Sequence, residues 1–140
     1  MREIEFRGKT KGGRWVYGFY LNYSAFEEGL GDSTEIVRHS IKRYDGGDIE
    51  DVIPESVGQY TGLKANGVKI FEGDIVKFKA IRGYDAYGKI LWDEKKAAFY
   101  SIGKRKAHRH YTTISYMRDT VGIEVIGNIH DNPEILEEGA

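Results

Sequence analysis

The residues whose types could do chemistry are concentrated in one basic segment. Residues 104–111 read KRKAHRHY, and two further tyrosines, Tyr100 and Tyr116, lie close by in the sequence. Lysine and arginine neutralise phosphates, and tyrosine rings stack on exposed bases. The sequence therefore predicts a binding site for a polyanion or another partner, made of Lys104, Arg105, Lys106, Arg109 and Tyr111. The alternative is a solvated loop whose positive charge is balanced by an acidic C-terminal block.

Other chemistries are disfavoured by the surroundings of each candidate. His108 and His110 would point the same way on a strand, but the flanking cations oppose a divalent metal and no third ligand lies nearby. No catalytic triad order or metalloprotease helix is present. Four acids lie at predicted turns, where such residues are ordinary: Glu72, Asp74, Asp93 and Glu94. We therefore expect no enzymatic activity, no metal and no cofactor.

Composition indicates a chain that folds without disulfides. The sequence has 140 residues and no cysteine, which excludes disulfides and cysteine nucleophiles and fits a reducing compartment. The N-terminal segment MREIEFRGKT is charged, and no apolar run approaches the roughly 20 residues of a membrane helix. We expect a cytoplasmic protein with no membrane partner.

The net charge of −1 hides two opposite blocks. Residues 80–118 hold nine Lys and Arg residues against three acids, whereas residues 119–140 hold six acids and no Lys or Arg. Blocks of this size can pair within one molecule, pair between copies, or present a basic face to an anionic partner. A homo-oligomer is the partner that we expect, with a host or phage protein or a nucleic acid as further possibilities.

Glycine turns and alternating residues predict the elements that must position these charges. Residues 2–21 indicate a hairpin that turns near Gly12-Gly13, and residues 35–53 indicate a second, with its turn at 45–48. Between them, Ser24 is a candidate cap for a short helix. Further strands are predicted at 57–61, 68–71 and 75–79, with turns at Gly62-Leu63-Lys64 and Asn66-Gly67, the latter a strong hairpin signal.

The C-terminal half shows strands at the spacing of a small barrel. Residues 73–129 give about five strands, including 111–117 and a last strand, 121–129, with a bulge at Gly127. Gly73-Asp74 leads into a strand and not into a helix, which indicates a structural turn and not a phosphate loop. Pro133 can open a short terminal helical turn.

Three stretches of this pattern resemble the YopX family of phage- and prophage-encoded proteins. They are residues 2–9 with 13–18, residues 57–64 with Gly67 and 71–76, and residues 125–134. The chain departs from the family pattern at residues 65–67 and in a variable insert at 23–50. The resemblance implies a mixed, β-rich N-terminal subdomain, an SH3-like barrel and possible homo-oligomerisation. It implies no known activity and no catalytic residues.

The sequence thus predicts a mainly β protein in two parts. Residues 1–56 form a β-rich, mixed N-terminal subdomain, and residues 57–140 form an SH3-like barrel with a short terminal helical turn. The expected function is that of a non-enzymatic phage or prophage accessory protein that binds a partner or assembles with itself. The alternative is a protein that binds single-stranded nucleic acid or another polyanion through residues 104–111.

Overall fold

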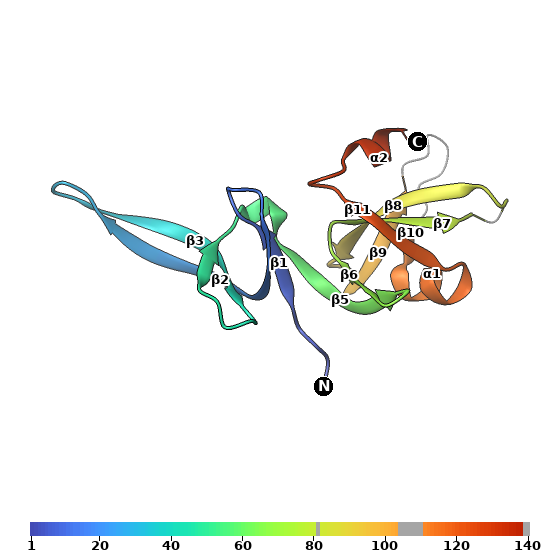
Figure 1. The fold of residues 1–140 in the computed structure, drawn as a ribbon, viewed down its shortest axis with the longest axis horizontal. Helices are drawn as coiled ribbons and strands as arrows, with labels where there is room; N and C mark the ends of the chain where they lie inside the picture. Colours follow the sequence, from blue (N-terminus) through green and yellow to red (C-terminus); the bar gives the residue numbers. More distant parts are fainter. Residues whose placement is uncertain (81, 104–110, 139–140) are drawn as a thin grey trace. The chain divides into compact units, whose positions relative to one another are not determined.

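Antiparallel strands make up most of the chain. The computed structural model describes residues 1–80, 82–103 and 111–138, and its strands form two antiparallel sheets (Figure 1). The prediction of a mainly β protein is confirmed. Residue contacts divide the chain into two compact units, Met1–Gln59 and Tyr60–Ala140. The domain boundary predicted between residues 56 and 57 stays a prediction.

The first unit is built on an antiparallel sheet with the strand order β4-β3-β2-β1, and the start of β5 pairs with β1. Its elements are β1 (Phe6–Lys9), β2 (Trp15–Glu28), β3 (Ser33–Arg43), β4 (Ile49–Asp51) and the 3-10 turn η1 (Pro54–Ser56). Both predicted hairpins are confirmed. The first turns at Gly13, whose positive φ of 89° favours glycine, and the second turns between β3 and β4.

The hairpin β2–β3 is longer than the sequence indicated. Its pairing runs unbroken from Gly18↔Arg43 to Glu28↔Ser33, so the short helix considered at Ser24 is wrong. A helix there would hold little more than one turn before Gly29, whereas the strand gains a continuous ladder with β3. Local sequence could not show this because the strand from Ser24 to Glu28 depends on its pairing with residues 33–37 of β3.

The outer part of this hairpin has no further strand beside it. On β2 the pairing with β1 ends at Gly18, and on β3 the pairing with β4 covers only residues 40–42. We call residues 22–37 the arm. The arm is a two-stranded ribbon that leads away from the buried cluster of its unit, formed by Val16, Ile41 and Val52 (Figure 1).

The second unit contains a five-stranded antiparallel sheet in the order β10-β9-β8-β7-β11 and a hairpin that β5 forms with β6. Its elements are β5 (Gly58–Ala65), which begins in the first unit, β6 (Val68–Phe71), β7 (Asp74–Lys79), β8 (Asp85–Asp93), β9 (Ala98–Gly103), β10 (Tyr111–Thr113), α1 (Ile114–Thr120), β11 (Ile123–Asn128) and α2 (Glu134–Glu138). The predicted bulge is confirmed by a register shift between Val125 and Gly127.

Three expectations for this unit need correction. The pairings of the described residues leave β10 and β11 as outer strands, so the predicted SH3-like barrel is confirmed only as an antiparallel sheet of five strands. The strand predicted at 111–117 ends at Thr113 and continues as α1, which buries Ile114 and Met117 in the core at helical spacing. The turn predicted at 62–64 is instead an irregularity inside β5, where Gly62 has a φ of 86°.

The core of the second unit fixes the turn that leads into β7. Ile70, Val76 and Ile90 are fully buried in this core. Among the described residues, no helix is long and apolar enough to cross a bilayer. The buried Asp74 carboxylate accepts a hydrogen bond from the Phe71 amide at 2.8 Å. The Gly73 amide donates to the Ile90 carbonyl at 2.8 Å, so this turn has a structural role.

Candidate functional site

Most of the predicted basic site lies outside the residues that the structure describes. Lys104, Arg105, Lys106 and Arg109 lie outside the described residues. Tyr111 is the first residue of β10 and pairs with Ile102 of β9. The proposed binding role of these residues stays a prediction.

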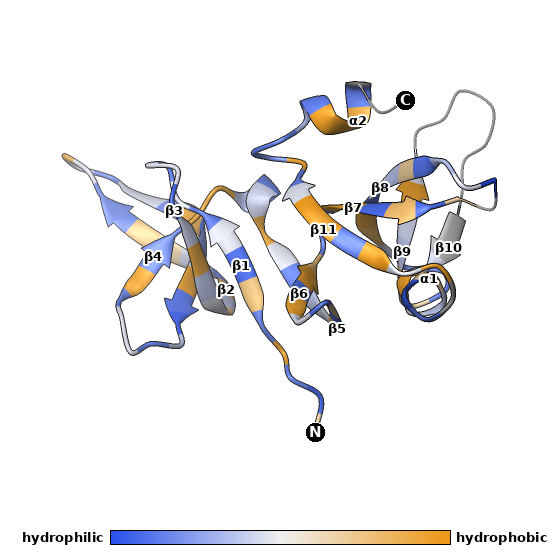
Figure 2. Ribbon diagram, turned by 45° about the vertical axis from the view of Figure 1, so that its right-hand side comes forward, coloured by the Kyte–Doolittle hydropathy of each residue, from blue (hydrophilic) through white to orange (hydrophobic). Residues whose placement is uncertain are grey.

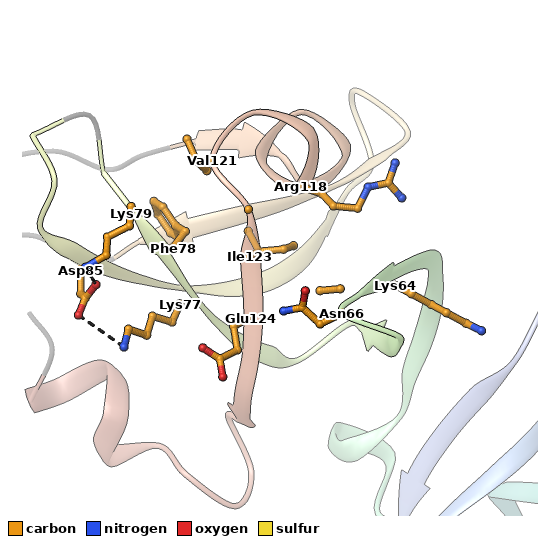
Figure 3. Close-up of a pocket in the computed structure, with 12 residues that line it drawn as sticks. Lys64, Asn66, Lys77, Phe78, Lys79, Asp85, Arg118, Val121, Ile123 and Glu124 are labelled. Carbon is orange, nitrogen blue, oxygen red and sulfur yellow. Dashed lines mark ion pairs between the residues drawn. The ribbon is translucent and has the colours of Figure 1, made fainter.

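A different group of cations lines a pocket of about 510 Å³ in the second unit (Figure 3). The pocket lies among the β5–β6 turn, β7, the start of β8, the end of α1 and the start of β11. Its volume falls in the range of roughly 300–1,000 Å³ that is typical of small-molecule pockets. The charged residues that line it are Lys64, Lys77, Lys79, Arg118, Asp85 and Glu124.

The cations of this pocket differ in how far they are neutralised. Lys79 and Lys77 both form ion pairs with Asp85, at 2.6 and 3.5 Å. Arg118 pairs through Nε with the neighbouring Asp119 at 2.9 Å. For Lys64 we find no ion pair among the described residues. Figure 3 shows the side chains of Lys64 and Arg118 extending away from the Lys77–Asp85 pair.

The ion pairs also set the charge of Asp85. The hydrogen bond from Lys79, together with the positive charge of Lys77, holds the pKa of the Asp85 carboxyl below its ordinary value. Asp85 therefore stays ionised near neutral pH. A general acid needs a pKa near the working pH, so Asp85 is suited to hold the two lysines and unsuited to donate protons.

The pocket floor is apolar. Ala65 and Ile123 are 4% and 6% exposed, and Phe78 packs against the same core cluster. A ligand that fits this lining combines an apolar body with a negative end. Sequence reasoning missed the site because its residues come from five separate elements between positions 64 and 124. The excess of cations in residues 80–118 gave no signal for it, since Arg118 is the one lining cation that falls in that block.

The arm is the second candidate surface, and it belongs to the first unit. Four large apolar side chains on it are exposed: Tyr23 at 42%, Phe26 at 70%, Leu30 at 111% and Val37 at 60%. Figure 2 shows hydrophobic and hydrophilic bands that follow each other along β2 and β3. Phe26 and Val37 share one face of the ribbon, because Val37 pairs with Ser24, and Tyr23 lies on the other face. Exposed apolar side chains gathered on one face mark interaction sites.

Contacts at the base of the arm hold it in one arrangement. The Tyr20 hydroxyl lies 2.5 Å from Nδ1 of His39, and partial burial raises the pKa of Tyr20. Arg38 donates to Asp51 of β4 at 2.6 Å and to Glu27 of the arm at 3.0 Å. The arm therefore has a fixed root and an exposed distal part.

A smaller pocket lies in the first unit. A pocket of about 240 Å³ beside Trp15 contains Arg43 and Asp45, which form an ion pair that lowers the pKa of Asp45. Within the described part of the chain, no group of three His, Cys, Asp or Glu residues could hold a metal ion.

The stretches that resemble the YopX family form turns. Besides the turn that Asp74 closes, Asn128 accepts hydrogen bonds from the amides of His130 and Asp131 at 3.0 and 2.9 Å. The Asn66-Gly67 turn has positive φ angles of 52° and 78°. The backbone conformation of these turns explains why these residue types occur there.

Comparison with known families agrees with this resemblance. A family model described as YopX protein matches residues 5–137. The chain belongs to the YopX family. The matched range covers both units and includes the arm, so the arm and the pocket are parts of a YopX-family domain. No curated protein matches the chain.

Proposed function

We propose that this YopX-family chain is a non-enzymatic accessory protein of phages or prophages that works as a binding and self-assembling module. The observation that carries the proposal is the arm. Among the described residues the two strands of the arm pair only with each other, and four of its large apolar side chains are exposed.

An isolated two-stranded ribbon is marginally stable in water. Its open edges also invite pairing with other chains. A partner that covers Phe26, Leu30 and Val37 would remove apolar surface from water, at roughly 25 cal/mol for each Å². This gain supports association as the role of the arm.

The electrostatics of the pocket support a binding role over a chemical one. Asp85 is held ionised by two lysines, and the pocket gathers apolar side chains beneath its cations. These features suit recognition of an anionic partner, and the lowered pKa of Asp85 makes that carboxylate a poor proton donor.

Self-assembly is tested by measuring molar mass with light scattering during size exclusion, over a range of protein and salt concentrations. The matched variant replaces residues 24–37 by Asn-Gly. Because Tyr23 and Arg38 are paired, a two-residue turn closes the shortened hairpin. We expect the wild-type chain to elute above its monomer mass of 15.9 kDa and the shortened chain at its own, smaller monomer mass. A wild-type monomer under every condition would disprove the proposal.

Nucleic-acid binding through residues 104–111 is a second candidate. The basic block at 80–118 favours it, because its net positive charge would attract phosphates. We expect fluorescence anisotropy to show binding of short single strands that weakens with salt and is lost when Lys104, Arg105 and Lys106 are all changed to Ala. Binding that is independent of salt, or that survives the triple change, would exclude this site.

A further inference from the structure

The arm is acidic as well as apolar. Residues 22–37 contain four acids, Glu27, Glu28, Asp32 and Glu35, and no Lys or Arg. Glu28 and Asp32 are exposed on either side of the tip, where the amide of Gly29 donates to the carbonyl of Asp32 at 2.8 Å. Charges of this sign repel nucleic acid and anionic membranes. The surface that fits the arm must therefore be basic with an apolar centre.

The pocket of the second unit has these properties. The side chains of Lys64 and Arg118 extend outward (Figure 3). The largely buried Ala65 and Ile123 line the pocket together with Phe78. Among the described residues Lys64 has no ion pair, so an incoming carboxylate need not displace one. The volume of about 510 Å³ is large enough for an apolar side chain such as Leu30 or Phe26.

We infer that the arm tip of one copy docks in the Lys64–Arg118 pocket of a second copy of this chain. Leu30 and Phe26 lie on the apolar floor, and Glu28 and Asp32 meet Lys64 and Arg118. The inference rests on the proposed self-assembly and assigns the two surfaces that perform it. Charge complementarity selects a second copy as the occupant, because the chain itself carries both the acidic tip and the basic pocket.

This contact joins two different surfaces, so each copy gives an arm and receives another. Such a head-to-tail interface forms a ring when the rotation between copies closes, and an open chain when it does not. A reciprocal pair, in which each of two copies donates its arm to the other, is the smallest closed form.

The test uses two charge-reversal variants of the full chain. The arm variant carries Glu28→Lys and Asp32→Lys, and the pocket variant carries Lys64→Glu and Arg118→Glu. Each variant alone places like charges at the contact, and we expect its dissociation constant for self-association to rise about tenfold or more. The matched control for the pocket variant, Arg82→Glu with Lys95→Glu, lowers the net charge by the same amount at exposed positions outside the pocket and should assemble as the wild type does.

Mixing the two variants in equal amounts decides the question. The mixture restores a wild-type contact between the acidic arm of one variant and the basic pocket of the other, and it forms a charge-reversed contact between the changed surfaces. We expect light scattering to show that the mixture regains the wild-type mass. Circular dichroism of each variant checks that it is folded.

The remaining outcomes separate the inference from the function on which it rests. A wild-type chain that is monomeric at every concentration would overturn both. A wild-type chain that assembles, with arm and pocket variants that assemble equally well, would overturn only the docking contact. Variants that dissociate alone and stay dissociated when mixed would also overturn the docking contact. The arm and the pocket would then each be needed for assembly without binding each other.

Discussion

Replacing Gly18 with Ala is expected to destabilise the first unit by at least about 3 kcal/mol, at or above the upper end of ordinary overpacking. A Cβ atom built on Gly18 would lie 1.9 Å from the Lys42 carbonyl oxygen and 2.9 Å from Cα of Arg43. These are backbone atoms of the paired strand, so no side chain can rotate away. Gly18 also pairs with Phe6 of β1, which leaves its strand no room to move.

Urea unfolding followed by circular dichroism measures this effect. Gly12→Ala is the matched control in the same unit, because its Cβ would meet only the Thr10 hydroxyl at 3.8 Å. We expect the control to change the free energy of unfolding by no more than about 0.5 kcal/mol. Equal stabilities of the two variants would show that β2 and β3 do not approach each other as described.

Ile90→Ala is expected to cost about 2–5 kcal/mol of the free energy of unfolding. Ile90 is fully buried in the core of the second unit, together with Ile70, Val76 and Ile123. Removing its side chain takes away transfer free energy and leaves a cavity that the sheet and α1 cannot fill. Total stabilities of small domains are about 5–15 kcal/mol, so the loss is a large share of the whole.

Two further variants show whether the loss of stability comes from lost packing in the core. Ile90→Val removes one methylene and should cost about 0.5–1.5 kcal/mol. Val68→Ala, at a position that is 52% exposed in the same unit, should cost no more than about 0.5 kcal/mol. Chemical denaturation of the three variants would contradict the described core if Ile90→Ala were no more costly than Val68→Ala.

Turns were the part of the fold that could be predicted from local sequence. Gly13, Asn66-Gly67 and the bulge at Gly127 were predicted at the positions where they occur. Each depends on a backbone conformation that few residue types adopt, so the residue type itself carries the information. Gly62 was misread as a turn because its positive φ is equally suited to an irregularity within a strand.

The ends of the strands and the helix α1 could be located only from the tertiary structure. The hairpin predicted over residues 2–21 included the start of β2 but gave no reason for the strand to continue to Glu28, since that depends on pairing with β3. Residues 111–117 have strand-like composition, yet from Ile114 onward they are helical because Ile114 and Met117 fill one core from one helix face.

The candidate surfaces also combine features set by the sequence with features set by the tertiary structure. The sequence alone established the YopX family, a mainly β fold, and an excess of cations in one block and of acids in another, because these follow from residue types and short-range order. Only the tertiary structure decided that Lys64, Arg118 and Ile123 share one pocket and that the arm leaves Phe26 and Leu30 exposed. The physical reason is that burial and convergence of side chains depend on contacts between distant segments, and local sequence does not specify those contacts.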